Sequence, residues 1–80
     1  MKIDDYIIAT QEADHEDGYP EYEDSADSSE GLKAAAKRAE DYGVPIHRLT
    51  VTAYWTTEHG KQHDILGNLE EVLRTVSPNM

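Results

Sequence analysis

Carboxylates are the side chains most capable of chemistry in this 80-residue chain, and many of them gather between residues 11 and 29. Closely spaced carboxylates can hold a cation, act as general acid and base, or attract a basic partner. Two tyrosines lie among them and add aromatic surface of the kind that anchors protein interfaces. The candidate partner-binding residues are Glu12, Asp14, Glu16, Asp17, Tyr19, Glu21, Tyr22, Glu23, Asp24 and Asp27.

A calcium loop of the EF-hand type is the first chemistry to compare with this acidic segment. Such a loop needs oxygen ligands at its first, third and fifth positions, glycine at the sixth and glutamate at the twelfth. When Gly18 is placed sixth, Ala13 stands first and Asp24 stands last. Alanine offers no side-chain oxygen, so the sequence predicts no metal site here.

Two histidines offer a second possible metal site. His59 and His63 are four residues apart, and this spacing places two rings on one face of a helix. Gly60 and the alternating pattern around it favour a hairpin instead, on which the rings do not converge in that way. We therefore expect no metal ligands among these residues.

Catalysis by paired carboxylates needs an apolar pocket that raises the pKa of one of them. The acidic segment has too few apolar residues to build such a pocket, and the chain has no cysteine nucleophile and no glycine-rich phosphate loop. Ser28 and Ser29 are explained by their position at the start of a helix. The sequence predicts a protein that is not an enzyme and uses no cofactor.

The negative net charge of the chain is concentrated in its first thirty residues. Residues 1–30 hold eleven acids and one base, a net charge of −10, whereas residues 31–80 hold six acids and six bases. DNA, RNA and anionic membranes need basic residues to neutralise them, so this distribution argues against direct binding to any of them. A basic protein surface is the natural partner. Without an apolar run of about 18 residues or a signal-peptide pattern, we expect a soluble protein of the cytoplasm.

The elements that position the acidic segment follow from hydrophobic patterns. Residues 6–10 combine β-branched and aromatic types and are typical of a buried strand. Residues 19–23 fit either an edge strand, which tolerates Pro20 and charge, or an irregular loop. A helix is expected from Ser28 to Tyr42, with Asp27 and Glu30 as its capping pair. Its apolar stripe is Leu32, Ala35, Ala36 and Ala39.

Gly43 and Pro45 end this helix, and a long strand is predicted over residues 46–57. Alternation places Leu49, Val51, Ala53 and Trp55 on its core face, with Tyr54 on the other. A tight turn at His59-Gly60, with Glu58 opposite Lys61, leads into a returning strand over residues 62–66. Asn68 and Glu71 then form the capping pair of a short C-terminal helix that also contains the ion pair Glu70–Arg74.

These elements predict an α+β fold in a single domain that spans residues 1–80. The expected architecture is a small antiparallel sheet of three to four strands, covered by one longer helix and a short C-terminal helix.

An α+β chain of this size, without cysteine and with a concentrated acidic surface, resembles the small acidic anti-defence proteins encoded by phages, of the anti-CRISPR and DNA-mimic type. Residues Glu12 to Asp27 carry the resemblance, and the helix from Ser28 to Tyr42 supports them. The resemblance implies a stoichiometric, non-enzymatic inhibitor in the cytoplasm of a bacterial host cell. Its partner would be a groove lined by Lys and Arg on a nucleic-acid-guided complex, such as a CRISPR effector complex.

Two functional hypotheses follow. In the first, carboxylates that alternate along a strand, about 6.7 Å apart, imitate a nucleic-acid backbone and block a basic partner. In the second, the chain is an accessory interaction domain that acts through its β-hairpin or a sheet edge. Both a monomer and a homodimer are compatible with the sequence.

Overall fold

Four strands form one antiparallel sheet in the computed structural model, which describes residues 3–10 and 22–76. The strands are β1 (Asp5–Thr10), β2 (Glu23–Ala26), β3 (Leu49–Thr57) and β4 (Gly60–Asn68). Their order across the sheet is β2-β1-β3-β4, so β2 and β4 are the two edges. Of residues 19–23, expected to form either an edge strand or an irregular loop, only Tyr22 and Glu23 are described, and Glu23 is the first residue of β2.

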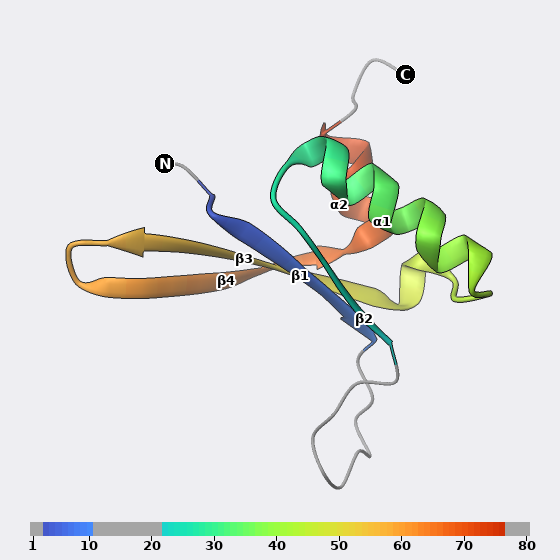
Figure 1. Cartoon of the computed structure of the whole chain (residues 1–80), viewed down its shortest axis with the longest axis horizontal. Coiled ribbons are helices and arrows are strands. Elements are labelled where there is room, and N and C mark those ends of the chain that lie inside the picture. The colour runs from blue at the N-terminus through green and yellow to red at the C-terminus, as the bar shows by residue number, and fades with distance from the viewer. Residues whose placement is uncertain (1–2, 11–21, 77–80) are drawn as a thin grey trace, which may run out of the picture.

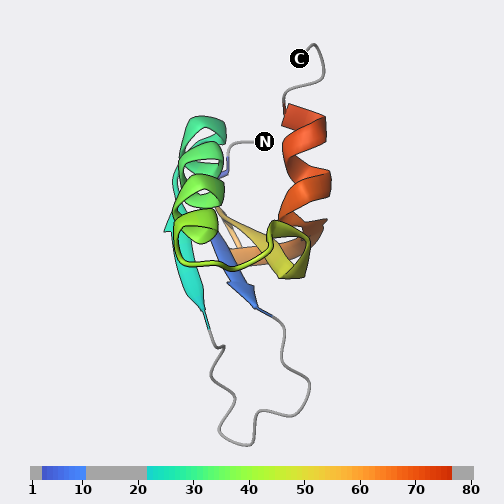
Figure 2. The same ribbon diagram turned by 90° about the vertical axis from the view of Figure 1, so that its right-hand side faces the viewer.

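Two helices cover one face of the sheet (Figures 1 and 2). They are the longer α1 (Ser29–Asp41) and the short C-terminal α2 (Leu69–Val76). The 3₁₀ turn η1 (Ile46–Arg48) connects α1 to β3. The predicted α+β fold is confirmed.

The core lies between this face and the helices. Ile8 on β1 pairs with Val51 on β3, and both are fully buried, so both side chains point toward the helices. The predicted stripe of α1 is buried, and its three alanines let the helix lie close to the sheet. The buried cluster consists of Ile8, Leu32, Ala35, Ala36, Ala39, Leu49, Val51, Leu69 and Val72.

The ends of α1 are fixed by local hydrogen bonds. Ser28 is the N-cap, and its Oγ accepts a hydrogen bond from the Gly31 N–H at 3.0 Å. The cap is therefore one residue later than the predicted Asp27, because only the residue three before Gly31 can reach that N–H. At the other end Gly43 has φ 77°, as predicted for a left-handed terminator, and leaves Tyr42 as the C-cap.

The predicted strand over residues 46–57 begins three residues too early. After Pro45 the chain makes the turn η1, in which the Arg48 N–H donates to the Pro45 carbonyl at 3.0 Å, and β3 starts only at Leu49. The core face of β3 is otherwise as expected at Leu49, Val51 and Ala53, which are all fully buried.

Trp55 is half-buried and not part of the core. The β3–β4 hairpin extends well past the helices (Figure 1), so positions beyond Ala53 lack the cover that α1 and α2 give to the inner half of the strand. Alternation along a strand identifies the face of a side chain, but it does not show where the covering layer ends.

The hairpin turn is one residue earlier than predicted. Thr57 pairs with Gly60, so Glu58 and His59 are the turn residues, and Lys61 pairs with Thr56 and not with Glu58. Thr57 Oγ1 accepts a hydrogen bond from the His59 N–H at 3.0 Å, which stabilises this register.

The end of β4 leads directly into α2. The register between β3 and β4 shifts between Val51 and Thr52. Gly67 has φ 131°, a backbone conformation that is strained in any residue other than glycine. Asn68 Oδ1 accepts from the Glu71 N–H at 2.9 Å, and Glu71 Oε1 accepts from the Asn68 N–H at 3.4 Å. The predicted capping pair of the C-terminal helix is confirmed, as is the ion pair Glu70–Arg74 at 3.6 Å.

Candidate functional site

Residues 11–21 of the acidic segment stand between β1 and β2 in the chain. The residues that flank them, Thr10 and Tyr22, are hydrogen-bonded to each other. The Thr10 N–H donates to the Tyr22 carbonyl at 3.0 Å, and the Tyr22 N–H donates to Thr10 Oγ1 at 3.1 Å. Thr10 is 6% exposed, so this pair of bonds lies at the margin of the core. Thr10 and Tyr22, the described residues on either side of residues 11–21, are therefore joined to each other. Residues 11–21 contain five carboxylates.

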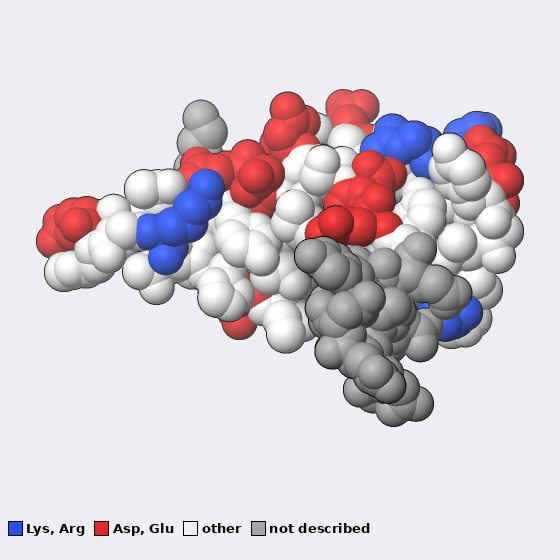
Figure 3. All heavy atoms as spheres, turned by 60° about the horizontal axis from the view of Figure 1, so that its bottom comes forward, with Lys and Arg blue, Asp and Glu red and all other residues white. Residues whose placement is uncertain are grey.

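Four of the ten predicted partner-binding residues belong to the part of the chain that the structure describes: Tyr22, Glu23, Asp24 and Asp27. The other six lie outside the described residues: Glu12, Asp14, Glu16, Asp17, Tyr19 and Glu21. Glu23 and Asp27 are exposed, whereas Tyr22 and Asp24 are half-buried. Figure 3 shows several described carboxylates gathered near the middle of one face of the molecule.

Asp24 is engaged within the molecule. It pairs with Ile8 across the β1–β2 ladder, so its side chain points to the helix-covered face. There its Oδ2 accepts a hydrogen bond from Arg38 Nε on α1 at 2.8 Å, and its Oδ1 accepts from the Ser25 N–H at 2.7 Å. The hydrogen bond from Arg38 is the main cause that lowers the pKa of Asp24. This ion pair ties the β2 edge to α1.

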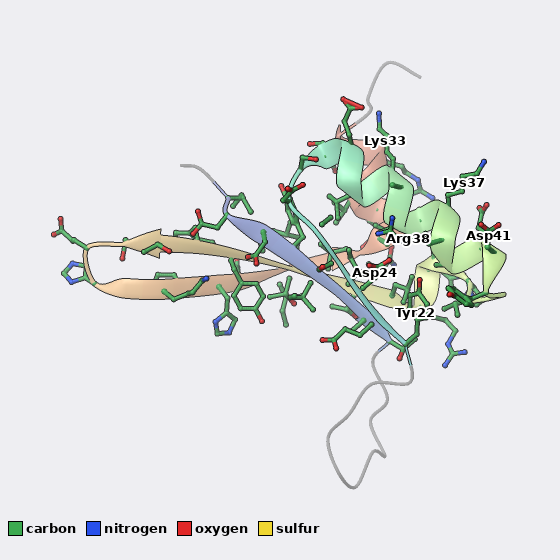
Figure 4. The ribbon with its side chains drawn as sticks, viewed as in Figure 1. Tyr22, Asp24, Lys33, Lys37, Arg38 and Asp41 are labelled. Carbon is green, nitrogen blue, oxygen red and sulfur yellow. The ribbon has the colours of Figure 1, made fainter. Side chains whose placement is uncertain are left out.

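A groove lies beside this ion pair. Tyr22, Asp24 and Arg38, which line it, lie near one another in Figure 4. The groove has a volume of about 690 Å³, and it lies between the β2 edge, the C-terminal end of α1 and the segment that follows. The rings of Tyr22 and Tyr42 contribute two of its walls, with centroids 5.9 Å apart and planes inclined at 57°. Burial, and then the neighbouring Asp24 charge, raise the pKa of Tyr22.

Tyr42 contributes an exposed aromatic ring to the groove. Its side chain is 76% exposed, whereas aromatic side chains are usually packed against apolar surface. Val44 and Pro45 also line the groove. Glu23, Arg38 and Arg48 also line the groove, although the Glu23 side chain points to the opposite face of the sheet. The groove thus combines aromatic faces with charges of both signs, and it lies directly at Thr10 and Tyr22, where the acidic segment begins and ends.

The exposed side of α1 carries charges of both signs. Lys33 and Lys37 are exposed and point away from the sheet (Figure 4), so they do not neutralise the carboxylates of β2. The cation that does approach β2 is Arg38, whose pKa is raised by its hydrogen bond to Asp24.

The histidines of the hairpin are both exposed. The His63 ring stacks on Tyr54 with centroids 5.5 Å apart, whereas His59 lies in the turn, with Nε2 3.7 Å from Glu58 Oε2. Within residues 3–10 and 22–76, no group of three or more His, Cys, Asp or Glu side chains is placed to hold a metal ion. In the same residues, no helix has the length and apolar character needed to cross a membrane.

Comparisons of the chain with protein-family models, with curated proteins and with solved structures found no match.

Sequence reasoning missed the groove because its walls come from distant parts of the chain. The sequence pattern identifies Tyr42 only as the end of a helix and indicates no role for Arg38. One signal was available: Arg38 lies next to the buried positions Ala35 and Ala39 on the helix surface, so it borders the packed face. A residue at such a border can reach an edge strand.

Proposed function

We propose that this protein is a non-enzymatic inhibitor that binds a basic, nucleic-acid-binding surface on another protein. Its acidic segment attracts the partner, and the groove formed by Tyr22 and Tyr42 receives a side chain from it. The supporting observation is that the acidic segment is closed by Thr10 and Tyr22 at the groove itself. This mode of action is that of the anti-CRISPR and DNA-mimic proteins that the chain resembles, and it would operate in the bacterial cytoplasm.

The two parts of this surface have different physical roles. Carboxylates act over distance: they accelerate association with a positive surface, and salt weakens their effect. The groove acts at contact, where a Lys or Arg of the partner can lie over the exposed Tyr42 ring. A cation over an aromatic ring contributes about 0.5–2 kcal/mol, depending on how far it is desolvated.

The first experiment is capture of partners from a nuclease-treated bacterial lysate, followed by mass spectrometry. The native chain is compared with a variant in which Glu12, Asp14, Glu16, Asp17 and Glu21 become Gln or Asn. We expect the native chain to retain a nucleic-acid-binding protein and the variant to lose it. Addition of double-stranded DNA or heparin should release that partner, because both compete for the same basic surface.

A matched control changes the same number of charges elsewhere, at Glu30, Glu40, Asp41, Glu58 and Glu70. This variant has the same net charge as the first but keeps residues 11–21 intact. Equal loss of the partner from both variants would mean that net charge, and not the acidic segment, drives binding. Retention by both variants would contradict the proposal.

A single substitution tests the groove. Tyr42→Ala removes a ring that is 76% exposed, so the fold should remain intact while the affinity for the captured partner falls about five- to thirty-fold. Tyr42→Phe keeps the ring and should bind nearly as well as the native chain. If Tyr42→Ala binds as tightly as the native chain, the groove is not part of the interface.

The second candidate function is an accessory interaction domain that acts through the β-hairpin or a sheet edge. One observation favours it: residues 60–66 of the edge strand β4 are all exposed. Neutralisation of the acidic segment would leave such binding intact, and substitutions in β4 would abolish it.

A further inference from the structure

Among the described residues, the edge strand β4 pairs with another strand on one side only. Asp4 donates its N–H to the Tyr54 carbonyl at 2.8 Å, so Tyr54 turns its backbone groups toward β1. Tyr54 pairs with His63 on β4. In an antiparallel ladder both backbone groups of a residue point to the same side, and this side alternates along the strand. The N–H and C=O of His63 therefore point away from β3, as do those of Lys61 and Ile65.

Over residues 60–65, which precede the register shift near its end, this edge has little of the usual protection against pairing. Natural edge strands are short, charged, interrupted by proline or covered by another element. β4 has nine residues, and its only charged side chains are Lys61 and Asp64, which sum to zero. It has no proline, and Ile65 is 60% exposed. The hairpin also carries this edge away from the helices (Figure 1).

We propose that β4 pairs with β4 of a second copy of this chain, so that two sheets join into one continuous antiparallel sheet of a homodimer. This proposal rests on the β4 edge alone and is independent of the function proposed for the acidic segment. The sheet order places β2 and β4 at opposite edges, so dimerisation through β4 leaves both β2 edges uncovered.

The side chains of β4 select a second copy as the occupant and set the register. A two-fold axis through His63 places His63 opposite its counterpart and Lys61 opposite Ile65 of the other copy. Gln62 then lies opposite Asp64 of the other copy, where its amide can donate to the carboxylate. A shift by two residues toward the C-terminus would instead place the two Asp64 carboxylates opposite each other, which is unfavourable. The register centred on His63 therefore keeps like charges apart and pairs Gln62 with Asp64.

The expected affinity is modest. The central register forms about six backbone hydrogen bonds through the outward groups of Lys61, His63 and Ile65. An interface limited to one strand edge is small, so we expect a dissociation constant of about 10–100 μM. Each copy carries a charge of −10, so salt should strengthen the dimer by screening repulsion between the copies. Salt should weaken binding of a basic partner to the acidic segment, so the two interactions respond to salt in opposite directions.

Sedimentation velocity of the full chain at 5–500 μM, in 50 mM and 500 mM NaCl, tests this proposal. The key pair of variants is His63→Pro and His63→Ala. Both lose the ring that stacks on Tyr54, but only proline removes the N–H that points to the free edge. Proline is tolerated at an edge position whose N–H faces solvent, so the monomer should still fold, which circular dichroism would check.

We expect the native chain and His63→Ala to form dimers, and His63→Pro to remain monomeric at every concentration. A native chain that stays monomeric up to 500 μM in high salt would overturn the proposal. Dimerisation of His63→Pro as strong as that of His63→Ala would overturn it as well.

Single cysteines test the register, because the chain has no cysteine of its own. His63→Cys places two thiols opposite each other at about 5.5 Å between Cα atoms, within the range of a disulfide. We expect it to cross-link at least ten-fold faster than Gln62→Cys or Asp64→Cys under mild oxidation. Faster cross-linking at either neighbouring position would overturn the proposed register.

Discussion

The two edges of the sheet are protected in very different degrees. β2 has four residues, two of which are Glu23 and Asp24, and it lies between the acidic segment and Asp27. β4 has nine residues and a net charge of zero. Short length and charge prevent pairing of another strand with β2, whereas β4 presents backbone groups with little electrostatic barrier.

This difference shows how a domain of this size can separate two kinds of recognition. At β2 recognition depends on side-chain charge, which acts at long range and is sensitive to salt. At β4 it depends on backbone geometry, which acts only at contact. The strands β1 and β3 lie between these edges and pack against the same helices, so each surface can be changed without the other.

The largest expected effect comes from the shared core. Ile8 is fully buried and pairs with Asp24 on one side and Val51 on the other, so Ile8→Ala should lower the free energy of unfolding by about 2–5 kcal/mol. Ile65→Ala on the exposed β4 edge should change it by less than about 0.5 kcal/mol. Urea unfolding at 5 μM protein measures both. Similar losses would contradict the assignment of Ile8 to the core and Ile65 to the surface.

A smaller effect is expected at the base of the acidic segment. Thr10→Val keeps the shape of the side chain but removes the acceptor for the Tyr22 N–H, so the free energy of unfolding should fall by about 1–2 kcal/mol. Amide hydrogen exchange at Tyr22 should become faster. Thr10→Ser keeps the hydroxyl group and serves as the control. Unchanged exchange at Tyr22 in Thr10→Val would mean that this bond does not hold the segment closed.

The end of β4 gives the next effect. Asn68→Ala removes the N-cap of α2 and should lower the free energy of unfolding by about 1 kcal/mol, whereas Asn68→Asp keeps a side-chain oxygen and should be close to neutral. Thermal unfolding followed by circular dichroism compares the two. Equal stability of the alanine and aspartate variants would show that the cap contributes little.

The smallest effect depends on pH and concerns the β2 edge. The hydrogen bond from Arg38 lowers the pKa of Asp24 in the folded state, so the ionised carboxylate stabilises the fold above the unfolded pKa of about 3.9. This contribution is lost as the pH falls through the folded-state pKa. Asp24→Asn should therefore melt at a lower temperature than the native chain near pH 7, and the difference should disappear at strongly acidic pH.

Glu23→Gln is the control for this pH experiment, because Glu23 lies on the same strand but is exposed and faces away from Arg38. Removal of this carboxylate should leave the melting temperature near pH 7 unchanged or slightly higher, since it relieves repulsion among neighbouring acids. A pH-independent difference between Asp24→Asn and the native chain would indicate a packing effect and not an effect of charge.

Features that depend on neighbouring residues were predictable from the sequence. The alanine stripe of α1, its end at Gly43 and the pair Asn68–Glu71 are all determined within a few residues, and the structure confirms each of them. Where two adjacent residues could serve the same purpose, the prediction was displaced by one position. Ser28 caps α1 in place of Asp27, since both types are good N-caps.

Features that depend on tertiary packing were not predictable. Trp55 follows the core alternation but lies beyond the helices, and no local pattern gives the length of a covering layer. The bond between Asp24 and Arg38 and the contact between Tyr22 and Tyr42 connect residues 14 and 20 positions apart. The sequence indicated an acidic segment as the candidate site, but the groove beside it appears only when α1 is placed against β2.

The closure at Thr10 and Tyr22 also affects how this protein can evolve. A connection whose ends are fixed by the fold can change length at little cost, since each doubling of a loop adds only about 0.6 kcal/mol of closure entropy. Insertions, deletions and new charges within residues 11–21 therefore leave the sheet and core largely unaffected. Under the proposed function, the segment could follow a changing partner surface through successive mutations while the rest of the chain stays the same.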